Sequence, residues 1–137
     1  MVSKLKNKSE ILYDTAKLLH DKSLYVGVAH AAYYSCYQLL KHIWLHSMLK
    51  SEEELTKNIS TGKIGSHEYL LNEIVSYIEK YPSKTGGKGD YRIVRDNMLQ
   101  LKRLRVKADY KDDDFCCKDS NSSITLSDKI LPILRRY

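Results

Sequence analysis

The chain has 137 residues, of which 42% are hydrophobic and 29% charged, and this is the size and composition of one globular domain. No run reaches the roughly 18 apolar residues that a membrane span requires. The basic start MVSKLKNKSE is followed by neither an apolar core nor a cleavage site, so no signal peptide is predicted. We therefore expect a single cytoplasmic domain over residues 1–137, with no membrane contact.

The net charge indicates the kind of binding partner, and the cysteines indicate the redox compartment. The net charge of +6 favours polyanions, nucleic acid above all. The three cysteines, Cys36, Cys116 and Cys117, are odd in number, and the last two are neighbours, which is poor geometry for an ordinary disulfide. We expect reduced thiols in a reducing compartment. No cluster has the ligand spacing of a zinc site, so neither a metal nor a cofactor is expected.

The sequence pattern of the first half of the chain predicts helices along its whole length. Residues 3–20 carry a helical apolar stripe, and residues 25–49 form the longest predicted helix, which is apolar on most faces and therefore central. Its small-residue stretch AHAAYYSCY allows a neighbouring helix to approach closely. Residues 51–58 predict a short helix with Ser51 as its N-cap and Glu54 as the reciprocal partner.

The second half continues the helical pattern. A third long helix is expected from Ser66, as N-cap, to about Tyr81, where Pro82 ends it. A fourth begins near Asp90 and reaches about Ala108. A polar loop then leads to a last short helix, capped near Thr125 or Ser127. No alternating strand pattern or internal repeat occurs, so the prediction is an all-α, up-and-down bundle of about five helices.

Several patterns resemble known sites but lack a required part. TGGKGD has neither the spacer nor the hydroxyl of a phosphate-binding loop. The acidic run after Asp109 lacks the spacing and the glycine of a calcium loop. His42 and His46 are one turn apart, yet no third ligand or glutamate accompanies them, so they are interpreted as surface residues. Cys36 is expected to pack in the core.

The segment RLRVKADYKDDDF, residues 103–115, holds the strongest candidates for a site. Leu101, Arg105 and Ala108 fall on nearly one face of the fourth helix, so Arg105 is expected on or beside the apolar stripe. Asp109 is its i+4 neighbour, and Tyr110 follows. On these residues alone, a structural ion pair and a functional arginine stay open as alternatives.

Three motifs in the correct order resemble the HEPN domain family. AHAAYYSCYQLLKHIW is similar to the second helix of that family, SHEYLL to the opening of the third helix, and LRVKADY to the R-x-x-A-D-Y ending of the fourth. The resemblance covers nearly the whole chain. It implies a helical bundle that forms a homodimer through its fourth helices, and many such domains are metal-independent endoribonucleases of toxin–antitoxin and defence systems.

The resemblance also implies roles for individual residues. In the nucleases an arginine clamps the scissile phosphate, a histidine a few residues later acts as acid or base, and the 2′-hydroxyl of the RNA attacks. Here no histidine follows Arg103 or Arg105. Counted from Arg105, Tyr110 stands in its place; counted from Arg103, Ala108 does, and Tyr110 falls where a trailing tyrosine of the family would be. Tyrosine titrates near pH 10 and is a poor base at neutral pH.

Three functions follow as alternatives. In the first, the protein binds RNA and cuts it, with Arg105, Asp109 and Tyr110 as the catalytic residues and Tyr33, Tyr34 and His67 as their support. Lys102, Arg103 and Lys107 attract the RNA. In the second, the domain is a non-catalytic partner of a minimal nucleotidyltransferase antitoxin, which attaches AMP to Tyr110. In the third, the same cluster only pins the fourth helix to the second.

Overall fold

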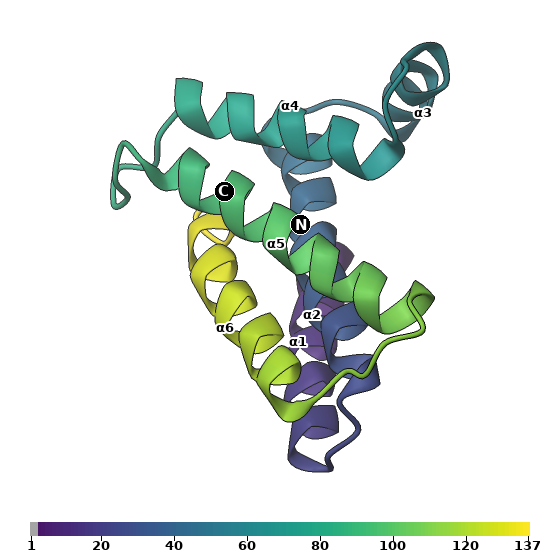
Figure 1. The fold of residues 1–137 in the computed structure, drawn as a ribbon. Helices are drawn as coiled ribbons and strands as arrows, with labels where there is room; N and C mark the ends of the chain where they lie inside the picture. The colour runs from purple at the N-terminus through teal and green to yellow at the C-terminus, as the bar shows by residue number, and fades with distance from the viewer. Residues whose placement is uncertain (1–2) are drawn as a thin grey trace.

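The computed structural model describes residues 3–137, in which helices joined by loops are the regular secondary structure (Figure 1). Six α-helices and one π-helical turn follow one another: α1 Lys4–Asp21, α2 Val26–His42, η1 Ile43–Ser47, α3 Glu52–Thr61, α4 Ser66–Lys80, α5 Asp90–Tyr110 and α6 Cys117–Leu134. The predicted all-α class is confirmed, with six helices rather than about five. None of these helices is long and apolar enough to cross a membrane.

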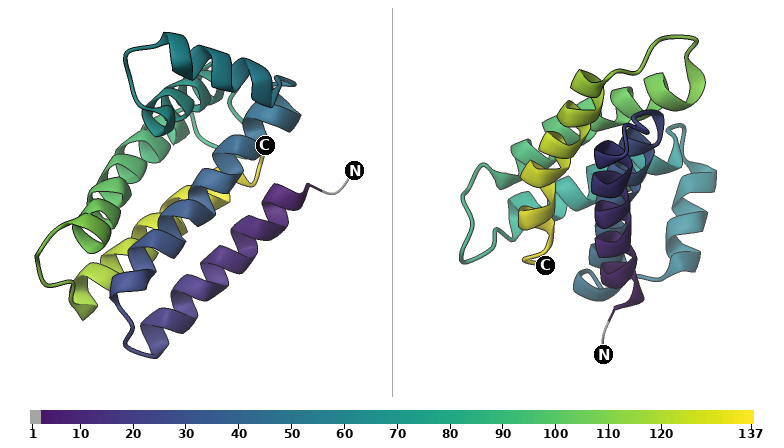
Figure 2. Two further views of the ribbon diagram at one scale, coloured as in Figure 1. Left: turned by 90° about the vertical axis from the view of Figure 1, so that its right-hand side faces the viewer. Right: turned by 90° about the horizontal axis from the view of Figure 1, so that it is seen from below.

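Helix α2 is the centre of the fold, as its apolar faces predict. It packs against α1, α5 and α6, while α4 packs along α5. Figure 2 shows α1 and α2 side by side along their length. The close approach expected of the small-residue stretch is present, because Ser9 and Ser35 each donate a hydroxyl hydrogen bond of 2.7 Å to the other's carbonyl oxygen.

The predicted helix over residues 25–49 changes geometry before it ends. After His42 it continues as the π-helical turn, in which the amide of Met48 donates to the carbonyl of Ile43 over 2.8 Å. Trp44 in this turn is fully buried, and its indole Nε1 donates to the carbonyl of Ser51. The longest single helix is instead α5, with 21 residues.

The structure tests the predicted N-cap residues of two helices, α3 and α4. Ser51 caps α3 as expected, since its side chain accepts a hydrogen bond of 3.1 Å from the amide of Glu54. Ser66, however, is the first residue of α4 rather than its N-cap, and Gly65 occupies the cap position without a side-chain bond. The site described below uses the residue that follows, His67.

The last helix is much longer than predicted. It starts at Cys117 rather than near Thr125 or Ser127, so the polar loop shrinks to residues 111–116. Serines disfavour helix interiors because their hydroxyls compete for the backbone. Here the buried ones are satisfied inside the helix or by a neighbour: Ser123 donates to the carbonyl of Asp119, and Ser120 bonds Nδ1 of His20 over 2.7 Å.

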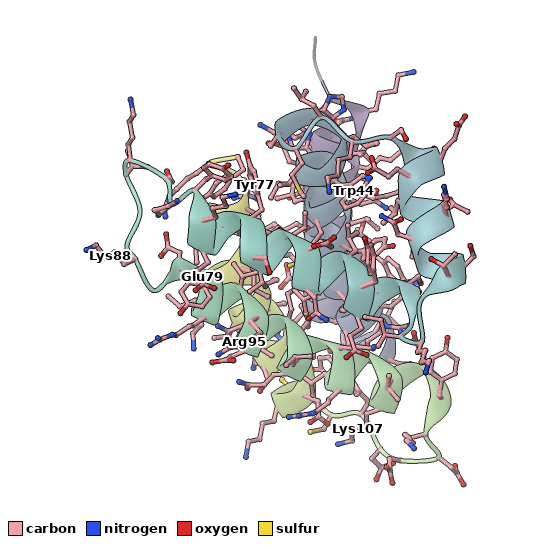
Figure 3. All side chains as sticks on the ribbon, turned by 90° about the horizontal axis from the view of Figure 1, so that it is seen from above. Trp44, Tyr77, Glu79, Lys88, Arg95 and Lys107 are labelled. Atoms are coloured by element: carbon pink, nitrogen blue, oxygen red, sulfur yellow. The ribbon has the colours of Figure 1, made fainter. Side chains whose placement is uncertain are left out.

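A capping box fixes the start of α6. The carboxylate of Asp119 accepts hydrogen bonds of 3.1 Å from the amide of Cys116 and from Nζ of Lys107 on α5. These bonds, led by the one from the Cys116 amide, lower the pKa of Asp119. Lys107 and Arg95 lie on the side of α5 that faces away from α4 (Figure 3). The box therefore joins α5 to α6 at the end where the candidate site lies.

We predict that Asp119→Ala lowers the free energy of unfolding at pH 7 by about 1 kcal/mol, the usual cost of a lost helix cap. Because the pKa of Asp119 is lower in the folded than in the unfolded protein, this stabilisation is complete above about pH 5 and is lost as the pH falls through the folded-state pKa. Urea unfolding at pH 7 and pH 3 measures it, with Asp112→Ala in the preceding loop as the control. An equal deficit at both pH values would contradict the prediction.

Candidate functional site

Arg105 lies inside the protein, on the face of α5 that the spacing predicts. Its side chain is only 10% exposed, and Leu101 one turn earlier is fully buried. The guanidinium carbon lies 5.0 Å from the ring centroid of Tyr33, 5.6 Å from Tyr34 and 5.7 Å from Tyr110. Aromatic rings attract a cation at such distances. Nε of Arg105 has no hydrogen-bond partner among residues 3–137.

One carboxylate oxygen joins Arg105 to a histidine on the central helix. Oδ2 of Asp109 lies 3.6 Å from Nη1 of Arg105 and 3.0 Å from Nδ1 of His30 on α2. The side chain of Asp109 is 21% exposed and that of His30 is 54% exposed. Asp109 therefore connects a buried guanidinium to an imidazole at the surface.

His67, the supporting histidine, closes the site from the first turn of α4. Its Nδ1 lies 2.9 Å from the hydroxyl of Tyr33, and its ring centroid lies 4.4 Å from that of Tyr37. Burial, followed by the charges of Arg105 and Lys102, lowers the pKa of His67. Burial also raises the pKa of Tyr33. Both groups are therefore held neutral at pH 7.

Tyr110 is the most exposed of the predicted catalytic residues. It is the last residue of α5, and 72% of its surface is open to solvent. Its ring still lies over Arg105, whereas the preceding Asp109 turns to His30. The structure thus brings Arg105, Asp109 and Tyr110 together, with Tyr33, Tyr34 and His67 around them.

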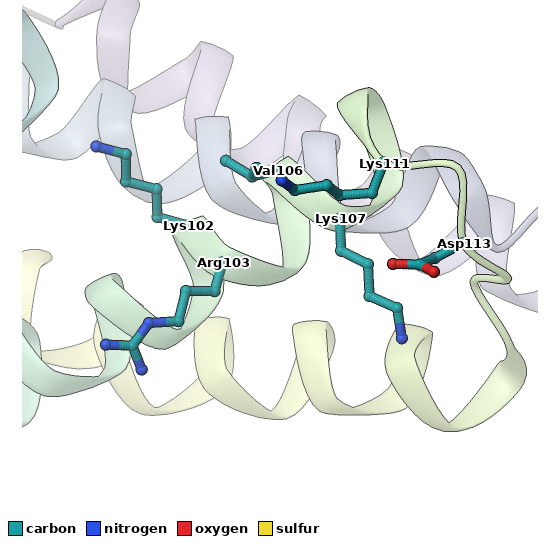
Figure 4. A pocket seen from close by; sticks show the side chains of 6 residues that line it. All are labelled: Lys102, Arg103, Val106, Lys107, Lys111 and Asp113. Carbon is teal, nitrogen blue, oxygen red and sulfur yellow. The ribbon is translucent and has the colours of Figure 1, made fainter.

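The predicted RNA-binding cations line a groove of about 400 Å³ along the end of α5 (Figure 4). Arg103 and Lys107 extend toward α6, and Lys102 extends to the opposite side of the helix. Lys107 is partly engaged by Asp119. The complete lining is Lys102, Arg103, Val106, Lys107, Lys111 and Asp113.

Sequence reasoning missed two members of this site. Lys111 lies one turn after Lys107 and adds a fourth cation to the groove. Its i+4 spacing was a usable signal. His30 carries no local signal of a link to Arg105, because its partner Asp109 is 79 residues away in the sequence. Only the packing of α2 against α5 brings those two together.

The remaining polar clusters offer no comparable arrangement. Within residues 3–137, no group of three or more histidine, cysteine or acidic side chains is placed to hold a metal ion. The prediction that His42 and His46 are surface residues is right for His46 and wrong for His42, which is buried because its Nδ1 bonds the hydroxyl of Ser3 and its ring stacks on His46 at 5.0 Å. Cys36 is buried, and burial raises the pKa of its thiol, so it is a core residue as predicted.

Comparisons of the chain with protein-family models, with curated proteins and with solved structures found no match. Functional inference therefore rests on the geometry of this site and on the three motifs described above.

We predict that Arg105→Ala lowers the free energy of unfolding by about 1–3 kcal/mol, because it removes a buried side chain and leaves Asp109 without its cation. Arg105→Lys should also be less stable than the wild type, since a compact ammonium replaces the planar guanidinium that packs on the rings. Urea unfolding at pH 7 measures both, with Arg103→Lys on the exposed side of the same helix as the matched control. Wild-type stability in Arg105→Lys would show that the rings do not require a guanidinium.

Proposed function

We propose that this protein is a HEPN-like RNA-binding domain that serves as a toxin, defence or RNA-processing component and cleaves RNA without a metal ion. The single observation that supports this most strongly is the basic groove along the end of α5, the helix that also carries Arg105 and Asp109 of the cluster. Lys102 belongs to both regions, because it lines the groove and its charge acts on His67.

The charges of the groove suit a phosphate backbone. Four cationic side chains line it against one carboxylate, that of Asp113. Exposed lysines and arginines attract phosphates and release the counterions of the nucleic acid, so the affinity falls as salt rises. Arg105 adds a further positive charge on the same helix, and the exposed hydroxyl of Tyr110 at the end of α5 is accessible as a hydrogen-bond donor.

The HEPN-like fold and the homodimer are parts of the same proposal. The order of the helices and the positions of the three motifs on α2, α4 and α5 support the fold. Ile93 and Leu99 are apolar side chains of α5 that are about two-fifths exposed, at 41% and 40%, and contact with a second copy would cover such surface.

We predict salt-dependent binding of a single-stranded RNA oligonucleotide, measured by fluorescence anisotropy. The double variant Lys102→Gln/Lys111→Gln should bind more weakly, and its log–log salt slope should be shallower by about 1.4, because each phosphate contact on a single strand contributes about 0.7. Lys8→Gln on the exposed face of α1 should match the wild type. Binding that is absent, or a slope that the double variant leaves unchanged, would refute the proposed RNA surface.

The exposure of Tyr110 favours a second candidate function. A phenol that is 72% exposed beside a buried cation is accessible to a modifying enzyme, which fits a domain that a nucleotidyltransferase antitoxin labels with AMP. In this alternative Tyr110 is the modified residue and the domain need not be catalytic.

For this alternative we predict that co-expression with a minimal nucleotidyltransferase antitoxin adds an adenylyl group to the intact mass. Tyr110→Phe should abolish the gain, because it removes the acceptor oxygen and retains the ring. Tyr91→Phe, on the same helix, is the control and should be modified like the wild type. A mass gain that persists in Tyr110→Phe would rule out Tyr110 as the acceptor.

A further inference from the structure

His30 is the one histidine of the site that is both hydrogen-bonded to a carboxylate and open to solvent. Its side chain is 54% exposed, and Nδ1 lies 3.0 Å from Oδ2 of Asp109. We propose that His30 is the acid–base residue of RNA cleavage and takes the place of the histidine that is missing after Arg105. This proposal rests on the proposed function and assigns the proton transfer in it.

The hydrogen bond to Asp109 determines which nitrogen of His30 can react. An ionised carboxylate only accepts hydrogen bonds, so Nδ1 carries the proton and Nε2 is the atom able to accept one. The ring of Tyr34 packs against His30 with its centroid 4.7 Å away and restricts the tilt of the imidazole. Asp109 therefore acts as a positioning residue that fixes both the tautomer and the direction of the ring.

Arg105 contacts Asp109 from the buried side of the site. Its Nη1 lies 3.6 Å from the same Oδ2, so one oxygen is shared between the guanidinium and the imidazole. This contact holds Asp109 toward His30 instead of leaving it in the solvent. The positive charge of Arg105, on the buried side of the site, also stabilises the negative charge that develops on the phosphate during the reaction.

His67 is the competing histidine, and its surroundings suit this role less well. It bonds the hydroxyl of Tyr33, packs on Tyr37, and has a pKa lowered first by burial and then by the charges of Arg105 and Lys102. A group surrounded in this way has little access to a substrate hydroxyl. His30 combines an orienting carboxylate with an open nitrogen.

The proposed step is a transesterification within the RNA. Nε2 of His30 takes the proton of the 2′-hydroxyl, the 2′-oxygen forms a bond to the adjacent phosphorus, and the bond from phosphorus to the 5′-oxygen breaks. The leaving 5′-oxygen takes a proton from water, and the imidazolium then returns its proton to the resulting hydroxide. The products are a 2′,3′-cyclic phosphate and a 5′-hydroxyl, and no metal or redox partner is consumed.

The test is single-turnover cleavage of a single-stranded RNA oligonucleotide by the full chain, with RNA affinity measured in parallel. His30→Ala should bind RNA close to wild-type affinity and lose about 100-fold or more of the cleavage rate, the usual contribution of a general base. Added imidazole should restore part of that rate, because it can occupy the exposed space. His46→Ala, another exposed histidine, is the matched control, and circular dichroism confirms that each variant is folded.

The possible outcomes separate this inference from the proposed function. If the wild type binds no RNA, the proposed function fails and the role of His30 fails with it. RNA binding without cleavage by the wild type, or wild-type cleavage by His30→Ala, overturns the role of His30 alone. Loss of cleavage without rescue by imidazole also overturns it, because His30 would then only position other groups. A substrate with 2′-deoxyribose at every position should remain intact, and its cleavage would overturn attack by the 2′-oxygen.

Discussion

The buried guanidinium of Arg105 links α5 to α2, and the polar residues of the candidate site are arranged around it. A charge removed from water is costly unless other groups compensate it. Here Tyr33 and Tyr34 offer their rings from α2, and Asp109 offers a carboxylate from the next turn of α5. If α5 were shifted by one turn, the charge would lose its partners on α2. The cluster therefore fixes the register between these helices as well as adding stability.

The cluster around Arg105 has a buried part, which packs helices together, and a part that is exposed to solvent. Arg105 and Tyr33 are buried, and burial lowers the pKa of His67, so these three residues form the interior part of the site. His30 and Tyr110 are exposed to solvent, and the basic groove lies along the same end of α5 as Tyr110. The structural and functional interpretations of the arginine are thus compatible, because a residue that pins two helices also sets the positions of the groups that a substrate would meet.

Much of this arrangement could be predicted because its signals are local. Apolar periodicity predicts the first five helices, Ser51 marks the start of α3, and the i, i+4, i+7 spacing turns Arg105 inward. The start of α6 was predicted wrongly, since its serines favour a loop locally and only the tertiary contacts of this segment, such as that between His20 and Ser120, compensate. His30 could not be assigned to the site, since its contact with Asp109 depends on how two distant helices pack.

A double-mutant cycle between Arg105 and Tyr33 tests the central claim most directly. The free energies of unfolding of Arg105→Met, Tyr33→Leu and the double variant are compared with that of the wild type, so that effects of each side chain on other neighbours cancel. We expect a favourable coupling of about 0.5–2 kcal/mol, the range of a cation packed on an aromatic face. Additive effects, with no coupling beyond error, would contradict the claim that this contact holds α5 against α2.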